Sequence, residues 1–260
     1  MCKILIISAH APVTRNRLIS RAWSYFAASG ETDGFGAAWI GRSGRLGWAK
    51  SSAPVLPTTE RPDWLAGFSG SSGMAEPSDG GWLLLHGRRA TCGVSLENTH
   101  PMLDDGAAAL IHNGVVSSET IHNVSTTCDS ELLLRAMLSH GPAGLADVSG
   151  YFAFAMLRRR KDGWHAAVVR DDTARLRFGR SRLADVWGTT DDALRIAGAT
   201  PHGDHRANTA VLFSPEMISR TVNVTKAPPV AKTQLDMEER WAVASGRARS
   251  LSFLREEVTK

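Results

Sequence analysis

The sequence is poor in cysteine: it has three in 260 residues, at positions 2, 92 and 128. Three scattered cysteines cannot build a disulfide framework, and none belongs to a CxxC pair of the kind that binds zinc. The nine histidines show no HExxH motif or similar metal-ligand spacing. The sequence therefore predicts free, reduced thiols, no metal site and no cofactor.

Long apolar runs and a large charge imbalance are missing too. The opening run is too short for a secretion signal, and nothing approaches a membrane span. We therefore expect a cytoplasmic protein without membrane contact. The net charge is +4, with short basic clusters at residues 158–161 and 175–182 that have acidic neighbours. Solvated faces are the favoured interpretation, and a phosphate or nucleic-acid surface remains the alternative.

Short apolar runs rich in β-branched residues predict strands, divided by Gly-, Pro- and Ser-containing turns. The predicted strands cover residues 3–10, 34–40, 48–52, 81–90, 106–116, 150–159, 164–172, 186–191, 194–200 and 209–215. Helices are predicted over 15–29, 129–140 and, within a Pro- and Ser-rich loop, near 62–68. Asp129 or Ser130 is expected to cap the second helix. The pattern favours an α+β fold with two packed antiparallel sheets.

The composition changes after about residue 225. Residues 226–232 read "KAPPVAK", a linker by composition. Beyond it, Trp241, Ala244, Ala248 and Leu251 fall on one face of a predicted helix. We therefore expect a domain over 2–225 and an appendage over 226–260, whose helix docks either on its own domain or on a partner.

Cys2 directly follows the initiator Met1, which is commonly removed before a small residue. The new terminus would carry an α-amine whose pKa is roughly 7.7–8.0, so part of it is unprotonated at neutral pH. Such an amine can serve as the base for the adjacent thiol. The alternative is a buried cysteine that leads into a core strand.

Three further motifs carry polar groups suited to amide chemistry. "GRRATCG" (87–93) follows an apolar strand, where an arginine suits recognition of a carboxylate. "HNG" (112–114) is either a hairpin turn or a two-donor oxyanion hole. "CDSE" (128–131) places an acidic side chain at a helix start, for capping or for binding an ammonium group. With Cys2, they supply what the attack on a free amino acid's side-chain amide requires.

Taken in order, these motifs resemble the class II glutamine amidotransferases, which are N-terminal-nucleophile hydrolases. The family pattern runs Met-Cys, R-x-A-T-x-G, N-x-H-P, H-N-G and [ST]-D-[ST]-E, and this chain reads "MC", "RRATCG", "NTHP" (98–101), "HNG" and "CDSE". "DGFG" (33–36) resembles the stand-alone members. The chain departs from the pattern where Arg89 replaces a common tryptophan, Cys92 a histidine, and Cys128 a Ser or Thr. The resemblance covers about residues 2–220.

The resemblance implies an αββα sandwich and a role for each matching residue. Cys2 would be the nucleophile and its α-amine the base, while Asn113 and the Gly114 N–H would form the oxyanion hole. The implied substrate-binding residues are Arg88, with Thr91, for the α-carboxylate, Asp129 for the α-ammonium, and the adjoining Cys92 and His112.

The implied reaction is hydrolysis of L-glutamine to glutamate through a γ-glutamyl thioester. The ammonia would pass to a separate synthetase, because the chain shows no Walker-type phosphate loop. A homo-oligomer is compatible with this interpretation, and nucleic acid is not an expected partner. The alternatives are hydrolysis of another amide by the same fold, and a non-catalytic scaffold subunit.

Overall fold

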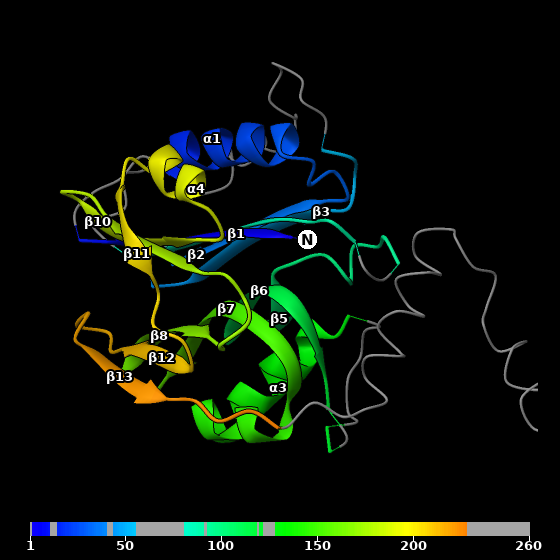
Figure 1. Cartoon of the computed structure of the whole chain (residues 1–260), viewed down its shortest axis with the longest axis vertical. Coiled ribbons are helices and arrows are strands. Elements are labelled where there is room, and N and C mark those ends of the chain that lie inside the picture. The colour runs from blue at the N-terminus through cyan, green and yellow to red at the C-terminus, as the bar shows by residue number, and fades with distance from the viewer. Residues whose placement is uncertain are drawn as a thin grey trace, which may run out of the picture.

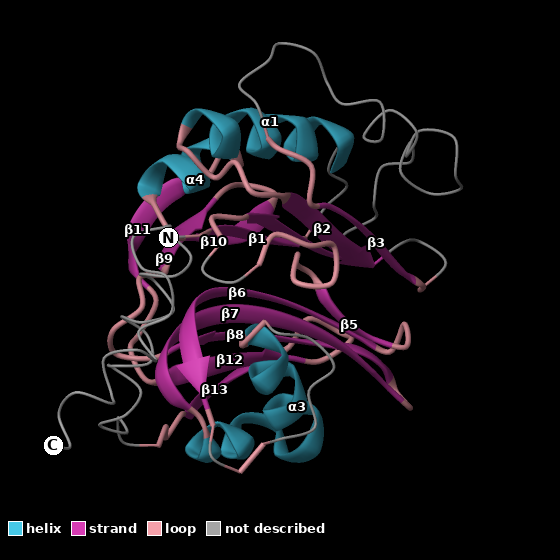
Figure 2. Ribbon diagram, turned by 90° about the vertical axis from the view of Figure 1, so that its right-hand side faces the viewer, coloured by secondary structure: helices cyan, strands magenta, loops and turns pink. Residues whose placement is uncertain are grey.

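The computed structural model describes residues 2–10, 15–40, 44–55, 81–90, 93–118, 120–121 and 128–227. Two antiparallel β-sheets lie face to face, with helices on both outer sides (Figure 1). The four layers are separate in the view of Figure 2, where α1 (Arg15–Ala28) and α4 (Asp191–Ile196) cover one sheet and α3 (Ser130–His140) covers the other. The expected helix–sheet–sheet–helix sandwich is confirmed.

The first sheet has seven strands. Their order is β11 (Thr200–Asp204), β9 (Arg177–Arg180), β10 (Ala184–Gly188), β1 (Lys3–Ala9), β4 (Gly81–Gly87), β2 (Phe35–Ile40) and β3 (Leu46–Ser51). The N-terminal strand is thus central, paired with β10 on one side and β4 on the other. This position holds the start of the chain between two neighbours.

The second sheet has six strands. Their order is β13 (Ser219–Asn223), β12 (Thr209–Phe213), β8 (Gly163–Arg170), β7 (Ser149–Arg160), β6 (Ala108–Ser117) and β5 (Met102–Asp104). A 3₁₀-helix, η1 (Gly141–Asp147), connects α3 to β7. Trp82, Trp187 and Phe213 pack together between the sheets, with Trp82 and Trp187 stacked at a centroid distance of 6.3 Å.

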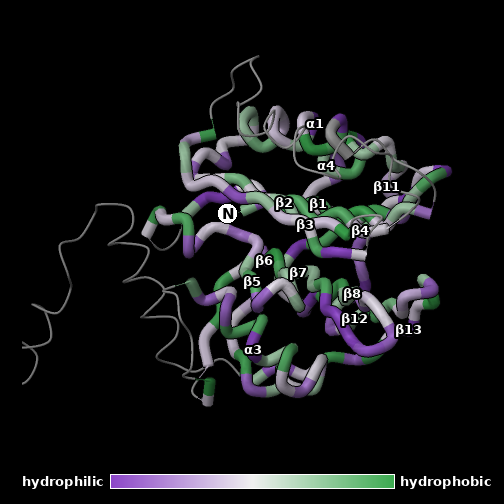
Figure 3. Tube along the Cα trace, turned by 180° about the vertical axis from the view of Figure 1, so that it is seen from behind, coloured by the Kyte–Doolittle hydropathy of each residue, from purple (hydrophilic) through white to green (hydrophobic). Residues whose placement is uncertain are grey.

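Strand alternation divides the core into three layers. In β1, Ile4 and Ile6 face the second sheet, whereas Leu5 and Ile7 face α1 and α4. Each such fully buried side chain contributes about 1.5–3 kcal/mol through removal of apolar surface from water. Figure 3 shows hydrophobic stretches along these central strands.

Helix α1 forms where the sequence predicts it, because its buried positions lie on one face. Ile19, Trp23 and Phe26 are buried at helical spacing, and Ala22 and Ala27 fill the positions between them. Helix α3 is also confirmed and is followed by Gly141 at φ 60°. No described helix is both long and apolar enough to cross a membrane.

Residues 194–200 were predicted to be a strand, which is wrong. Their first part belongs to α4, and only Thr200 begins β11. The Thr190 side chain accepts a hydrogen bond from the Ala193 N–H, and Asp191 and Asp192 lie in the first turn near the positive end of the helix dipole. A six-residue helix is too short to show a periodicity in its sequence. The short strands β5, β9, β11 and β13 also lacked a clear pattern.

Two arginines of the basic cluster at residues 175–182 are neutralised within the fold. Arg177 pairs with Asp191 at 2.7 Å and Asp204 at 2.8 Å, and Arg180 pairs with Asp185 at 2.6 Å. These ion pairs favour the interpretation as a solvated face over a phosphate or nucleic-acid surface for these two arginines. The predicted helix near 62–68 and the appendage beyond Ala227 lie outside the described residues and stay predictions.

Candidate active site

Cys2 lies at the end of the inter-sheet layer, directly before β1. Because Ile4 and Ile6 face the second sheet, alternation places Cys2 on the same face, where the core opens to solvent. Its Sγ atom lies 3.2 Å from the Arg89 carbonyl oxygen and 3.4 Å from the Arg89 nitrogen. The thiol is therefore held against the chain that follows β4.

The surroundings of Cys2 favour the protonated thiol. Burial raises the pKa of the Cys2 thiol above its usual value, and this outweighs the Arg89 N–H and the nearby Arg88 charge, which lower it. The Asp129 carboxylate raises the same pKa, so it lies within electrostatic range of the sulfur. A nucleophilic Cys2 thus needs a base that removes its proton during the reaction.

Asp33 fixes the segment that carries Arg88 and Arg89. Its carboxylate accepts a hydrogen bond from the Ala90 N–H at 2.8 Å, and its own N–H donates to the Arg88 carbonyl at 3.0 Å. The Arg88 N–H donates to the Gly34 carbonyl at 2.8 Å. The "DGFG" motif alone predicts no role for Asp33, whereas in the structure this residue holds the loop beside the thiol.

Arg88 is buried, with 3% of its surface exposed. Lys3 pairs with Gly87 across β1 and β4, so alternation places Arg88 opposite Cys2 on the inter-sheet face. The Arg88 Nη2 donates to the Gly93 carbonyl at 2.9 Å, and Asn98 Nδ2 donates to the same oxygen at 3.1 Å. The "RRATCG" and "NTHP" motifs thus meet at Gly93. Thr91 and Cys92 lie outside the described residues, and their roles stay predictions.

The "HNG" motif is not a hairpin turn. Asn113 and Gly114 lie inside β6, opposite Ala153 and Phe152 of β7. Gly114 adopts φ +152°, and a Cβ atom there would lie 2.1 Å from the Tyr151 carbonyl oxygen. Only glycine fits this backbone, and the pairing of β6 with β7 continues through it without a shift of register.

Asn113 is a buried amide with unused hydrogen-bonding capacity. It is 1% exposed, and its Oδ1 has no hydrogen-bond partner within the described part of the chain. Ala109 and Ile111 belong to the inter-sheet core, so alternation turns Asn113 toward the first sheet as well. The Asn113 Oδ1 accepts no hydrogen bond from a described residue. A rotation of the side-chain amide by half a turn therefore exchanges Oδ1 and Nδ2 without the loss of a hydrogen bond to the oxygen, and it places the Nδ2 donor where the oxygen lies.

Asp129 occupies the N-cap position of α3, but it is not a side-chain cap. The residue is in the αR conformation and makes no capping bond, which corrects the expectation that Asp129 or Ser130 would cap this helix. The Asp129 Oδ2 instead accepts the Val116 N–H at 2.7 Å and so ties α3 to β6. This bond aims the carboxylate toward the Cys2 end of the sandwich.

Tyr151 lies between Cys2 of the first sheet and the Asp129 and Gly114 region beside the second sheet. The sequence motifs do not predict a role for it. Burial raises the pKa of its hydroxyl, and the charges of Asp129 and Cys2 raise it further, so both lie near the Tyr151 phenol. Its carbonyl also lies against Gly114. Cys2, Arg88, Asp129 and the Asn113–Gly114 backbone therefore gather around one end of the inter-sheet layer.

Three buried histidines lie behind these residues. The His86 and His100 rings are 4.0 Å apart between centroids, and those of His100 and His112 are 6.4 Å apart. His86 Nε2 donates to the His112 carbonyl at 3.1 Å, and His112 Nδ1 lies 2.9 Å from Ser130 Oγ on α3. The His112 ring thus contacts the start of α3. Within the described ranges, no group of three or more His, Cys, Asp or Glu side chains is arranged to hold a metal ion.

The three histidines are expected to make the fold acid-sensitive. Burial lowers the pKa of His86 and His112 to about 3, and that of His100 well below its usual value. In the unfolded chain each titrates near ~6.5, so below that pH the unfolded state binds more protons and the free energy of unfolding falls. The fall should reach about 1.4 kcal/mol per pH unit for each of His86 and His112 between pH ~6.5 and pH ~3, and His100 should add to it as the pH falls below ~6.5.

The substitution His100→Phe isolates one of these groups, because neither His100 ring nitrogen has a hydrogen-bond partner in the described structure. Urea unfolding at several pH values between ~7 and ~5 should show a pH slope smaller by up to about 1.4 kcal/mol per unit. His140→Gln, at an exposed position, is the control and should keep the full slope. An unchanged slope in His100→Phe would mean that His100 is not held neutral.

Similar folds occur among solved structures. Glutamine phosphoribosylpyrophosphate (PRPP) amidotransferase from B. subtilis matches with a TM-score of 0.59 and 15% identity, over 85% of this chain and 49% of that one. A structure of the allosteric regulatory enzyme of purine biosynthesis matches with a TM-score of 0.62 and 17% identity, over the same shares. The chain thus spans about half the length of each.

The matches to solved structures are matches of fold. A scan against protein-family models finds no match, and a search of curated proteins finds none at a significant level. The αββα sandwich expected from the motif order is confirmed by these neighbours. Residue roles therefore depend on the geometry described above.

Proposed function

We propose that this chain hydrolyses L-glutamine to L-glutamate and ammonia with Cys2 as the nucleophile. The supporting observation is the charge arrangement at Cys2: the buried Arg88 lies opposite Cys2 across β1 and β4, and the Asp129 carboxylate, held by the Val116 N–H, is close enough to raise the pKa of the Cys2 thiol. A free α-amino acid carries one carboxylate and one ammonium group, which this pair of charges complements. The fold of the PRPP amidotransferases supports the same chemistry.

The reaction needs Met1 to be removed, which leaves the α-amine on Cys2. This amine takes the thiol proton as Sγ attacks the glutamine amide carbon, and it then gives the proton to the departing nitrogen, so that ammonia leaves. The resulting γ-glutamyl thioester is attacked by water, which supplies a hydroxyl group to the acyl carbon and returns a proton to the sulfur. The raised thiol pKa is consistent with a base that acts during attack.

Asn113 and the Gly114 N–H are proposed to stabilise the oxyanion that forms at each attack. Arg88, with Thr91, would bind the α-carboxylate, and Asp129 the α-ammonium, while Cys92 and His112 would border the substrate. The ammonia would serve a separate acceptor enzyme. Self-association of this chain is compatible with the same proposal.

Asp129→Asn tests the assigned substrate. The amide keeps an oxygen for the Val116 N–H, which Asp129 binds at 2.7 Å, and removes only the charge. The KM for glutamine should rise about 10- to 100-fold, the scale of one charge-assisted hydrogen bond, with a much smaller change in kcat. The assay measures glutamate and ammonia released in equal amounts.

Asp147→Asn, which removes an exposed charge in η1, is the matched control and should leave the KM unchanged. A chain that hydrolyses a simple amide without an ammonium group, and is unaffected by Asp129→Asn, would favour another amide substrate. A chain that releases no ammonia from glutamine after removal of Met1 would refute the proposal.

A further inference from the structure

The basic run at residues 158–161 takes no part in the site around Cys2. Tyr151 lies near the start of β7, whereas Arg158 and Arg160 lie at its other end. Phe152, Phe154 and Met156 pack against α3, so alternation places the two arginines on that same outer face of the second sheet. At about 3.4 Å per residue, roughly 24 Å of strand separates Arg158 from Tyr151 and roughly 31 Å separates Arg160 from it.

A cavity of about 410 Å³ lies on this outer face. Met156, Ala167 and Leu212 form a row across β7, β8 and β12, and Arg220 of β13 continues it, because these residues are register neighbours. Met137 of α3 and Pro142 of η1 close one side. The floor of the cavity is apolar.

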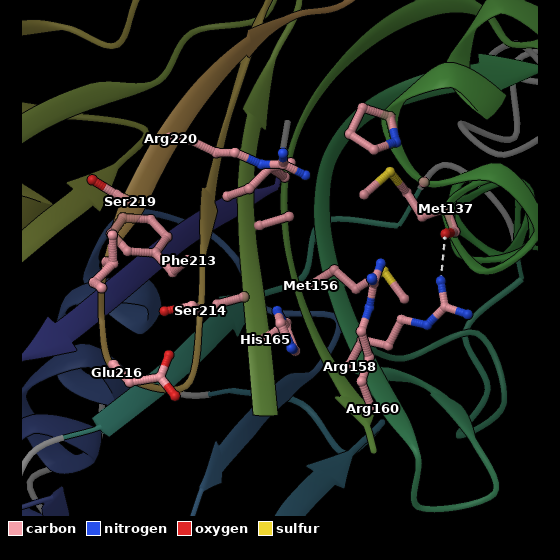
Figure 4. Close-up of a pocket in the computed structure, with 16 residues that line it drawn as sticks. Met137, Met156, Arg158, Arg160, His165, Phe213, Ser214, Glu216, Ser219 and Arg220 are labelled. Carbon is pink, nitrogen blue, oxygen red and sulfur yellow. Dashed lines mark hydrogen bonds between the residues drawn. The ribbon is translucent and has the colours of Figure 1, made fainter. Parts of the chain in front are cut away.

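Cationic side chains dominate the rim. Figure 4 shows Arg220 from β13 and Arg158 from β7 on either side of β8, with His165 between them. Arg158 Nη1 donates to the Met137 carbonyl at 3.1 Å, which fixes its guanidinium beside the floor. Arg160 and Arg220 make no ion pair with any described residue, unlike Arg177 and Arg180. The acidic residue lining the cavity is Glu216, in the turn between β12 and β13.

From these features we infer that the cavity binds a small amphipathic anion. Its phosphate or carboxylate group lies on Arg158, Arg160 and Arg220, whose planar guanidinium groups suit such oxygens, and its apolar, ring-sized body lies on Met156 and Leu212. The volume falls within the range of small-molecule sites, about 300–1,000 Å³. Three arginines against one glutamate select an anion, and the apolar floor selects one that carries a hydrophobic group.

The probe for this site is anilinonaphthalene sulfonate, an aromatic anion whose fluorescence rises in apolar surroundings. The folded, full-length chain should bind it saturably with one-to-one stoichiometry. The double variant Arg160→Gln/Arg220→Gln should bind it at least 10-fold more weakly, because two charge-assisted contacts are lost. Arg182→Gln is the matched control, since this exposed arginine lies between β9 and β10 in the other sheet, and it should not change the affinity.

Competition tests the contribution of the apolar floor. Phenyl phosphate should displace the probe at a concentration at least 10-fold lower than inorganic phosphate does. The inference is wrong if binding does not saturate, if the double variant binds as tightly as Arg182→Gln, or if the two phosphates compete equally well. Glutamine hydrolysis is measured separately, so failure of this inference leaves the proposal for Cys2 untouched.

Discussion

Cys2→Ala is expected to lower the rate of glutamine hydrolysis by at least about four orders of magnitude, the scale seen when a catalytic nucleophile is removed. The variant keeps the α-amine and the surrounding charges but cannot form the thioester. Its fold should be intact, because Cys2 precedes β1 and the hydrogen bonds of its Sγ within the described residues go to the Arg89 backbone. Ammonia release from glutamine and the urea midpoint are measured on the same sample.

Cys128→Ser is the matched control for this loss. Cys128 is buried with 5% exposure at the start of α3, and serine is of nearly the same size. It should retain most of the activity. If Cys2→Ala were as active as the parent chain, Cys2 would not be the nucleophile, and if neither protein released ammonia, the non-catalytic scaffold interpretation would replace the proposed enzyme. If Cys128→Ser lost activity as completely as Cys2→Ala, the loss in Cys2→Ala would no longer assign the nucleophile to Cys2 rather than to Cys128.

Asn113→Ala is expected to lower kcat about 10²- to 10³-fold, the effect of deleting one oxyanion donor. The KM for glutamine should change little, because the donor acts on charge that develops only during attack. The folded state loses no hydrogen bond to the Asn113 oxygen, which has no partner within the described residues. The measurement is the glutamine dependence of the initial rate, with circular dichroism to verify the fold.

Asn113→Asp supplies the matched variant, because it preserves the shape of the side chain and replaces the donor by a negative charge. It should be at least as inactive as Asn113→Ala. Asn223→Ala, at an exposed position on β13, should keep full activity. A folded Asn113→Ala protein with an unchanged kcat would remove Asn113 from the oxyanion hole.

Much of the fold follows from local sequence patterns. The short β-branched apolar run of β1 predicts a buried strand. The spacing of Ile19, Trp23 and Phe26 predicts helix α1, because apolar residues on one buried face of a helix recur every three to four positions. Residues 194–196 of helix α4 were predicted as part of a strand, because this six-residue helix has fewer than two turns and its sequence shows no recognisable helical repeat. The order of strands in the sheets depends on contacts between distant segments, which no local pattern contains.

The residues of the candidate site likewise fall into those that local motifs predict and those that only the tertiary fold brings together. The motif order identified Cys2, Arg88, Asn113 and Asp129, and the structure places them around one end of the inter-sheet layer. It did not identify Tyr151 or Asp33, whose importance comes from neighbours far along the chain. Asp129 was expected to cap α3, yet its carboxylate binds the Val116 N–H, because β6 passes within reach of the helix start. The chemistry of a side chain can be predicted from the sequence, whereas the hydrogen-bond partner of each polar side chain is determined by the tertiary fold.

The most direct test of the central proposal is the intact mass of the purified chain before and after treatment with diazo-oxo-norleucine, an electrophilic analogue of glutamine. The account predicts loss of Met1 and a single adduct, which peptide mapping places on Cys2. Excess glutamine should slow labelling, and Asp129→Asn should slow it as well. Retention of Met1 in an otherwise native protein, or an adduct on Cys92 or Cys128 alone, would contradict the assignment of Cys2 as the nucleophile.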